Sequence, residues 1–204
     1  MKKTAYLLPA LITDFVLFCI KLYIGLATSA LCIYSDGINN LFDCFALLAG
    51  FAGIFLAAKP PTENYPLGFK KAENLAGFCM ALIISGTGIY FVYLALERLM
   101  YPTPVAYRSL YAVLLGASLL AKLGCGIYMR SMKASHPSPV TVSVMADCFA
   151  DCGITAMTLL SYLTTRFSIL RADAVFGIIA GIITTINGIK LLKASAEALL
   201  DKKE

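Results

Sequence analysis

The sequence predicts an all-α integral membrane protein with six transmembrane helices and both termini in the cytoplasm. Of the 204 residues, 59% are hydrophobic and only 14% are charged, whereas a soluble domain carries about a quarter charged residues. The apolar residues form six blocks, each long enough for the roughly 20 residues that cross a hydrocarbon core. Lys and Arg, finally, gather on one side of the predicted bundle.

The predicted helices cover residues 6–29, 33–58, 74–99, 105–130, 140–164 and 172–194. The first follows Met1-Lys2-Lys3, which can also open a secretory signal, but its apolar run exceeds the roughly 7–15 residues of a signal core. We therefore expect a retained helix. A short uncharged turn follows it, and proline-containing segments at 59–71, 101–104 and 136–139 separate the next four helices. The sequence thus predicts a single transmembrane domain over 1–204 with a short cytoplasmic tail.

Orientation follows from the basic residues, because cytoplasmic loops carry an excess of Lys and Arg. One side of the bundle collects the N-terminus, the second and fourth loops and the C-terminus. That side carries Lys2, Lys3, Lys59, Lys70, Lys71, Arg130, Lys133, Lys190, Lys193, Lys202 and Lys203, and the other carries Arg98, Arg108, Arg166 and Arg171. This asymmetry places both termini in the cytoplasm and predicts the cytoplasmic membrane. It also accounts for the net charge of +5, so we expect no nucleic-acid partner.

Acidic residues inside two of the predicted helices are the candidates for function, because ionisable groups in a membrane are costly. The second helix contains Asn39 and Asp43, and the fifth contains Asp147 and Asp151. Residues four apart share one face of a helix. If the two helices face each other, three carboxylates and one amide carbonyl therefore converge within the bilayer.

Such a group of oxygens suits a hard divalent cation. Carboxylates this close repel one another, and a divalent cation relieves the repulsion. Oxygen ligands favour manganese, magnesium or calcium, whereas zinc favours His and Cys. The single histidine, His136, is predicted at the cytoplasmic edge of the fifth helix, away from the site. From spacing alone, a proton relay or structural polar contacts remain alternatives, with Asp14 paired with Lys21, and Lys122 in the fourth helix, as the partners.

Other residues near the candidate site allow two interpretations of their role. Asp36 lies nearer the outer surface and either guides ion exit or caps the second helix. The seven cysteines all lie in apolar blocks without a CxxC pair, so we expect no disulfide bonds and ordinary packing. Cys148 and Cys152 share a helix face, which leaves a soft-metal site as the competing interpretation.

Three segments carry motifs that resemble the cation diffusion facilitator family. Ser35-Asp36-Gly37-Ile38-Asn39-Asn40-Leu41-Phe42-Asp43 is similar to the family's second-helix motif in its Asn-x-x-x-Asp form. Ser138-Pro139 with Ala146-Asp147-Cys148-Phe149-Ala150-Asp151 is similar to the fifth-helix motif in its Asp-x-x-x-Asp form. Tyr65-Pro66-Leu67-Gly68-Phe69-Lys70-Lys71-Ala72-Glu73 resembles the segment that leads into the third helix. The matches follow the family's order along the whole chain.

The resemblance implies a homodimer that exchanges cytoplasmic metal for external protons by alternating access. It carries the transport site over to Asn39, Asp43, Asp147 and Asp151, a combination associated with manganese. The metal is then the transported substrate, so we expect no prosthetic group and no enzymatic activity. Iron, zinc, cadmium and cobalt remain alternative substrates.

The chain departs from the family pattern in two respects. Family members usually continue into a cytoplasmic metal-binding domain, and this sequence reads as a short form without it. A non-transporting membrane subunit that pairs with a full-length relative is therefore an alternative function. The site also has no histidine, so proton coupling is expected to run through the carboxylates.

Overall fold

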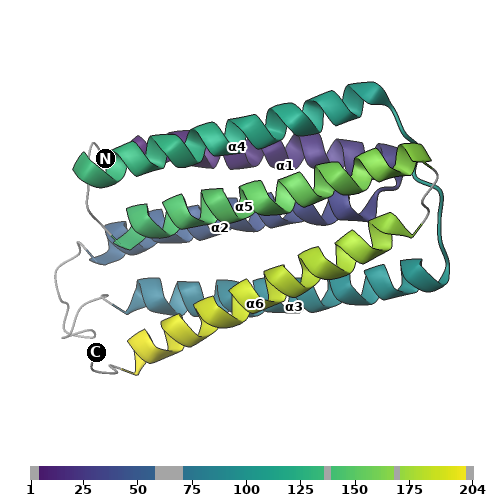
Figure 1. The fold of residues 1–204 in the computed structure, drawn as a ribbon. Coiled ribbons are helices and arrows are strands. Elements are labelled where there is room, and N and C mark those ends of the chain that lie inside the picture. The colour runs from purple at the N-terminus through teal and green to yellow at the C-terminus, as the bar shows by residue number, and fades with distance from the viewer. Residues whose placement is uncertain (1–4, 58–70, 136–138, 168–170, 201–204) are drawn as a thin grey trace.

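The computed structural model describes residues 5–57, 71–135, 139–167 and 171–200. Within these ranges the chain forms six long helices: α1 (Leu8–Thr28), α2 (Leu31–Ala57), α3 (Ala72–Met100), α4 (Ser109–Ser135), α5 (Pro139–Thr164) and α6 (Ala172–Leu199). Short 3-10 turns at Ala5–Leu7 and Thr165–Phe167 precede α1 and follow α5. The helices lie along one common direction (Figure 1). The predicted all-α fold class is confirmed.

Five of these helices are long and apolar enough to cross a membrane, as judged from the described residues: α1, α3, α4, α5 and α6. The second helix carries Asp36, Asn39, Asn40 and Asp43 in its first half, and these are the polar residues that it brings into the bundle. Its large apolar side chains Phe45 and Leu48 face outward. Many large apolar side chains of the other helices face outward, among them Tyr23, Leu26 and Leu120. This protein is therefore an integral membrane protein.

The observed bounds differ most from the predicted ones at α4, which runs from Ser109 to Ser135 rather than over 105–130, and at the end of α6, which reaches Leu199 rather than 194. Two backbone groups in the segment before α4 bond outside the helix. The N–H of Ala106 donates to the carbonyl of Thr28 at 3.0 Å, and the N–H of Arg108 donates to the hydroxyl of Tyr162 at 2.8 Å. These bonds hold the segment before Ser109 against α1 and α5, outside α4.

The third and sixth helices pack so closely that backbone atoms of one helix lie against glycines of the other. A Cβ atom added at Gly88 would lie 2.6 Å from the backbone N of Thr185, and one at Gly188 would lie 2.7 Å from the backbone N of Ser85. Small residues allow such close approach between membrane helices. In Figure 1 this pair lies apart from α1 and α4, with α2 and α5 between them. The bundle thus contains a tightly joined α3–α6 pair next to the other four helices.

One acidic residue joins three helices at the end of the bundle where α2 and α6 begin. Asp173 accepts hydrogen bonds from the backbone N–H groups of Leu31 and Cys32 at 2.9 and 3.1 Å, and Arg98 Nε lies 2.9 Å from its Oδ2. We call these contacts the Asp173 junction. They cap the N-terminus of α2, so the prediction that Asp36 performs this role is wrong. Because α2 already begins at Leu31, Asp36 lies inside the helix, beyond its first turn.

Candidate metal site

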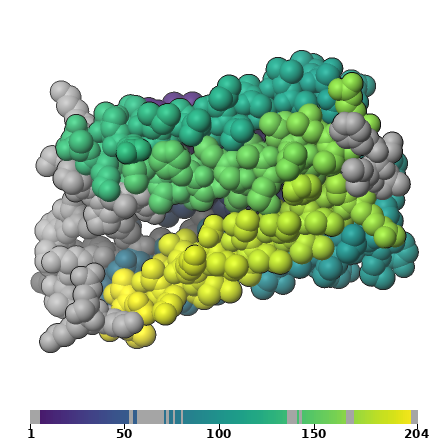
Figure 2. Space-filling model, in the orientation of Figure 1, coloured from purple at the N-terminus to yellow at the C-terminus, as the bar shows by residue number. Residues whose placement is uncertain are grey.

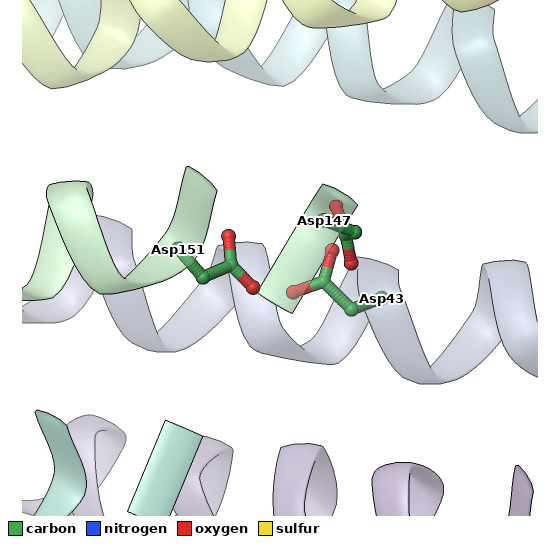
Figure 3. Close-up of side chains that lie close together, drawn as sticks. All are labelled: Asp43, Asp147 and Asp151. Carbon is green, nitrogen blue, oxygen red and sulfur yellow. The ribbon is translucent and has the colours of Figure 1, made fainter. Parts of the chain in front are cut away.

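Three aspartates from two helices converge in the interior of the bundle. Asp43 comes from α2, and Asp147 and Asp151 come from α5, where one helical turn separates them. One carboxylate oxygen of each lies within 4.8 Å of the others, and Figure 3 shows the three side chains directed toward a common point. Asp151 is buried, and Asp147 is the most exposed of the three. The predicted juxtaposition of α2 and α5 is therefore present in the structure.

Asn39 completes the predicted set of four. Its side-chain amide donates a hydrogen bond from Nδ2 to Asp151 Oδ1 at 3.0 Å. This bond links α2 to α5 one helical turn before Asp43. The amide therefore orients the Asp151 carboxylate. All four predicted residues line one cavity, so the structure brings the motifs of the second and fifth helices together.

A buried lysine contacts two of these aspartates. Lys122 on α4 is fully buried, and its Nζ lies 2.6 Å from Asp151 Oδ2 and 3.7 Å from Asp43 Oδ2. The same ammonium donates a hydrogen bond to Asp14 of α1. Lys122 is one of the partners that the structural-contact alternative offers for the paired aspartates, and the structure places it against them. Which of the acids it contacts depends on how α4 packs against the other helices, so no pattern within α4 gives that detail.

A second buried lysine forms a separate network nearer to the Asp173 junction. Lys21 Nζ lies 2.9 Å from Asp36 Oδ1 and donates a hydrogen bond to Thr155 Oγ1 at 2.8 Å. All three side chains are almost completely buried. Lys21 thus pairs with Asp36, while Asp14 pairs with Lys122. Asp36 is consequently held in an ion pair rather than exposed toward an exit.

The aspartates lie at the inner end of a cavity of about 680 Å³. Its other lining residues come from α2, α3, α5 and α6, and they include Gly50, Gly77, Asn187 and Lys190. These residues lie toward the end of the bundle at which α1 begins and α6 ends. In the space-filling view an opening between α5 and α6 is visible on that side (Figure 2). Beyond the aspartates, toward the Asp173 junction, the Lys21 network fills the interior.

The remaining candidate residues lie away from the aspartates or outside the described ranges. All seven cysteines are unpaired. Cys148 turns toward Cys125 of α4, with 3.8 Å between the two sulfur atoms, and the two pack in an apolar cluster with Leu47 and Met129. Cys152 is partly buried. His136 and the loop motif at 65–70 lie outside the described residues.

The cluster can hold a divalent cation in oxygen ligands. Carboxylate and carbonyl oxygens are hard donors suited to such ions, and at this site they come from helices on both sides of the cavity's inner end. Ionisable groups at this depth in a membrane protein mark ion and substrate pathways. Fold and site together define a membrane protein of the ion-transport class.

The comparison with known families makes this class specific. Residues 7–200 match the cation efflux transmembrane domain. The chain belongs to the cation efflux family, a family of cation transporters, in agreement with the resemblance found in its motifs.

Similar proteins share this domain at low identity. The chain is 26% identical over 179 residues to an uncharacterized transporter of Methanocaldococcus jannaschii, covering 86% of this chain and 62% of that protein. It is 24% identical to the manganese efflux system protein MneS of Bacillus subtilis, covering 91% and 64%. It is 22% identical to the cation-efflux pump FieF of Cronobacter sakazakii, covering 96% and 65%. The chain thus spans slightly less than two thirds of the length of these relatives.

Proposed function

We propose that this protein exports a divalent metal cation from the cytoplasm, with manganese as the preferred substrate, in exchange for protons. The observation that carries the proposal is the convergence of Asp43, Asp147 and Asp151 at the inner end of an accessible cavity. In the proposed site these three carboxylates and the amide oxygen of Asn39 are the metal ligands. Membership in the cation efflux family supports transport as the activity of the site.

Manganese is proposed on two grounds. The four proposed ligands are all oxygen donors, which favour hard cations over zinc. One similar protein is described as a manganese efflux system protein. Iron, zinc, cadmium and cobalt are the competing substrates, and direct competition with manganese in the transport assay distinguishes them.

The proposed direction of transport follows from charge and geometry. Lys71 precedes α3, Arg130 and Lys133 lie in the last turns of α4, and Lys193 lies near the end of α6. These helix ends share the end of the bundle where α1 begins (Figure 1). An excess of basic residues marks the cytoplasmic side. We therefore propose that the protein lies in the cytoplasmic membrane with both termini in the cytoplasm. The cavity extends from the aspartates toward this same end, which suits loading of the site from the cytoplasm.

Proton exchange and dimer formation complete the proposal. Carboxylates that gather around a cation are natural proton acceptors when the cation leaves, because their mutual repulsion then disfavours the fully charged state. A homodimer is proposed from the family resemblance.

The test is manganese uptake into proteoliposomes that contain the purified chain and a manganese-sensitive dye. We expect uptake driven by an imposed proton gradient, its loss when the gradient is collapsed, and its loss in Asp43→Ala. Glu97→Gln is the matched control, because Glu97 is an exposed acid near the end of α3 and outside the cavity. Absence of uptake with manganese, zinc and iron in a folded sample would reject autonomous transport. It would favour a non-transporting subunit that pairs with another chain.

A further inference from the structure

Lys122 places a positive charge in direct contact with the proposed metal ligands. The side chain is fully buried, and its Nζ approaches Asp151 at 2.6 Å and Asp43 at 3.7 Å. A metal bound to the same aspartates therefore meets an ammonium group at its ligand oxygens. Two cations that share carboxylates compete for them, and the competition is strong where water is scarce.

The geometry of these contacts separates Asp14 from the two ligands. Lys122 donates a hydrogen bond to Asp14 Oδ1. By contrast, Asp151 Oδ2 and Asp43 Oδ2 face the same ammonium at 2.6 and 3.7 Å and also line the cavity. A cation that enters from the cavity can therefore reach these two carboxylates, whereas Asp14 does not line the cavity. Asp14 is a buried partner that can hold the ammonium while the ligands bind elsewhere.

We propose that Lys122 is a tethered competitor of the transported metal and that Asp14 is its alternative partner. When the metal binds, the Lys122 ammonium withdraws from Asp151 and Asp43 and remains bonded to Asp14. When the metal leaves, the ammonium returns to the two ligands and offsets their charge. Lys122 thereby lowers the metal affinity of the site enough for the metal to be released. Asp14 weakens this competition, because it holds the ammonium when the metal occupies the ligands. This inference rests on the proposed function, because it assigns the competing cation to the proposed transport site.

Charge at the site distinguishes this role from simple packing. Asp14, Asp43, Asp147 and Asp151 carry four formal negative charges against the single positive charge of Lys122. Removing Lys122 makes the ligand group more negative and removes the competitor, so metal affinity rises. Removing the charge of Asp14 leaves the ammonium with only the metal ligands as partners, so metal affinity falls. If both residues only supported the fold, either change would weaken metal binding.

The experiment measures manganese affinity of the purified full chain by isothermal titration at one pH and one salt concentration. We expect Lys122→Gln to bind manganese at least about tenfold more tightly than the wild type, and Asp14→Asn to bind about tenfold more weakly. Lys190→Gln is the matched control. Lys190 is an exposed lysine that lines the same cavity, so its removal tests whether any lost positive charge would produce the effect. Its affinity should stay within about threefold of the wild type.

A double variant keeps the test independent of the stability of Lys122→Gln. Asp14→Asn/Lys122→Gln has no unpaired buried charge at this position, and it should bind manganese at least about tenfold more tightly than Asp14→Asn alone. The role of Lys122 is overturned if Lys122→Gln binds manganese no more tightly than the wild type and the double variant binds it no more tightly than Asp14→Asn. In that case the proposed function still stands, provided that the wild type binds manganese and Asp43→Ala abolishes the binding. Absence of manganese binding by the wild type, or binding unaffected by Asp43→Ala, overturns the site itself and the inference with it.

Discussion

Asn39 is the uncharged member of the four proposed ligands, and it is the position at which metal preference should be easiest to change. Its amide donates to Asp151 and lines the cavity beside Asp43. An imidazole at this place would offer a nitrogen donor, which zinc accepts more readily than manganese does.

We expect Asn39→His to raise the ratio of zinc to manganese transport by about tenfold. The measurement is competition of zinc against manganese uptake in proteoliposomes. Asn187→His serves as the control, because Asn187 lines the same cavity but comes from α6, which contributes none of the proposed ligands. An unchanged ratio in Asn39→His would remove Asn39 from the ligand set.

At this scale the sequence predicted the members of the site but not its charge partners. The spacing of Asn39 with Asp43 and of Asp147 with Asp151 defines helix faces, and the structure brings those faces together. The predicted pairing of Asp14 with Lys21 is wrong, because Asp14 pairs with Lys122 and Lys21 pairs with Asp36. The actual partners depend on the relative rotation and height of α1, α2 and α4, which no pattern within one helix records.

At the scale of elements, the contact between α3 and α6 depends on glycine at particular positions. Gly88 and Gly86 lie on the same helix, but only Gly88 faces the partner. An added Cβ atom at Gly86 meets nothing within 4 Å, whereas one at Gly88 meets the backbone of Thr185 at 2.6 Å. A backbone neighbour cannot move aside without separating the helices.

We therefore expect Gly88→Ala to lower the free energy of unfolding by about 1–3 kcal/mol, the usual cost of overpacking a tight contact. Gly86→Ala should change it by less than about 0.5 kcal/mol. Unfolding of the detergent-solubilised protein with increasing SDS measures both. Equal losses in the two variants would contradict the close packing of α3 and α6.

The Asp173 junction makes a second prediction for the elements. Asp173→Asn removes the charge that pairs with Arg98 and weakens the hydrogen bonds to the first turn of α2. Because Arg98 and Asp173 are largely buried, we expect a loss of about 2–4 kcal/mol in unfolding free energy. Arg171→Ala is the control, since Arg171 is exposed two residues away. A thermal melt that is unchanged in Asp173→Asn would show that the junction contributes nothing to stability.

Hydropathy located the elements well because membrane helices must be long and apolar. It failed at the start of α4, where hydrogen bonds to Thr28 and Tyr162 hold the preceding residues out of the helix. It also failed to find the cap of α2, which Asp173 supplies from α6. In both cases the partner is distant along the chain, so the local sequence contains no signal for it.

At the scale of the whole molecule, the two ends of the bundle differ in access to the site. The cavity reaches the aspartates from the end where α6 finishes, while the buried Lys21 network and the Asp173 junction occupy the other half. Transport by alternating access requires the second half to open when the first closes.

Single-cysteine labelling tests the proposed orientation of the molecule. In a background without the native cysteines, Ser131→Cys lies on the last turns of α4 and Ser109→Cys at its start, and both positions are exposed. We expect an impermeant maleimide to label Ser109→Cys in intact cells. Ser131→Cys should be labelled only after the membrane is permeabilised. The reverse pattern would invert the orientation and with it the proposed direction of transport.

The pairing of buried charges also constrains how the chain is made. Lys21 and Asp36 lie on consecutive helices, so the α1–α2 hairpin brings this pair into the bilayer already matched. Asp14 instead depends on Lys122, which lies 108 residues later. At roughly 5–20 residues per second, synthesis reaches Lys122 on the order of ten seconds after Asp14. During that interval α1 carries a costly acid without its ionic partner. We therefore expect the first helices to stay beside the insertion machinery until α4 arrives and supplies the partner of Asp14.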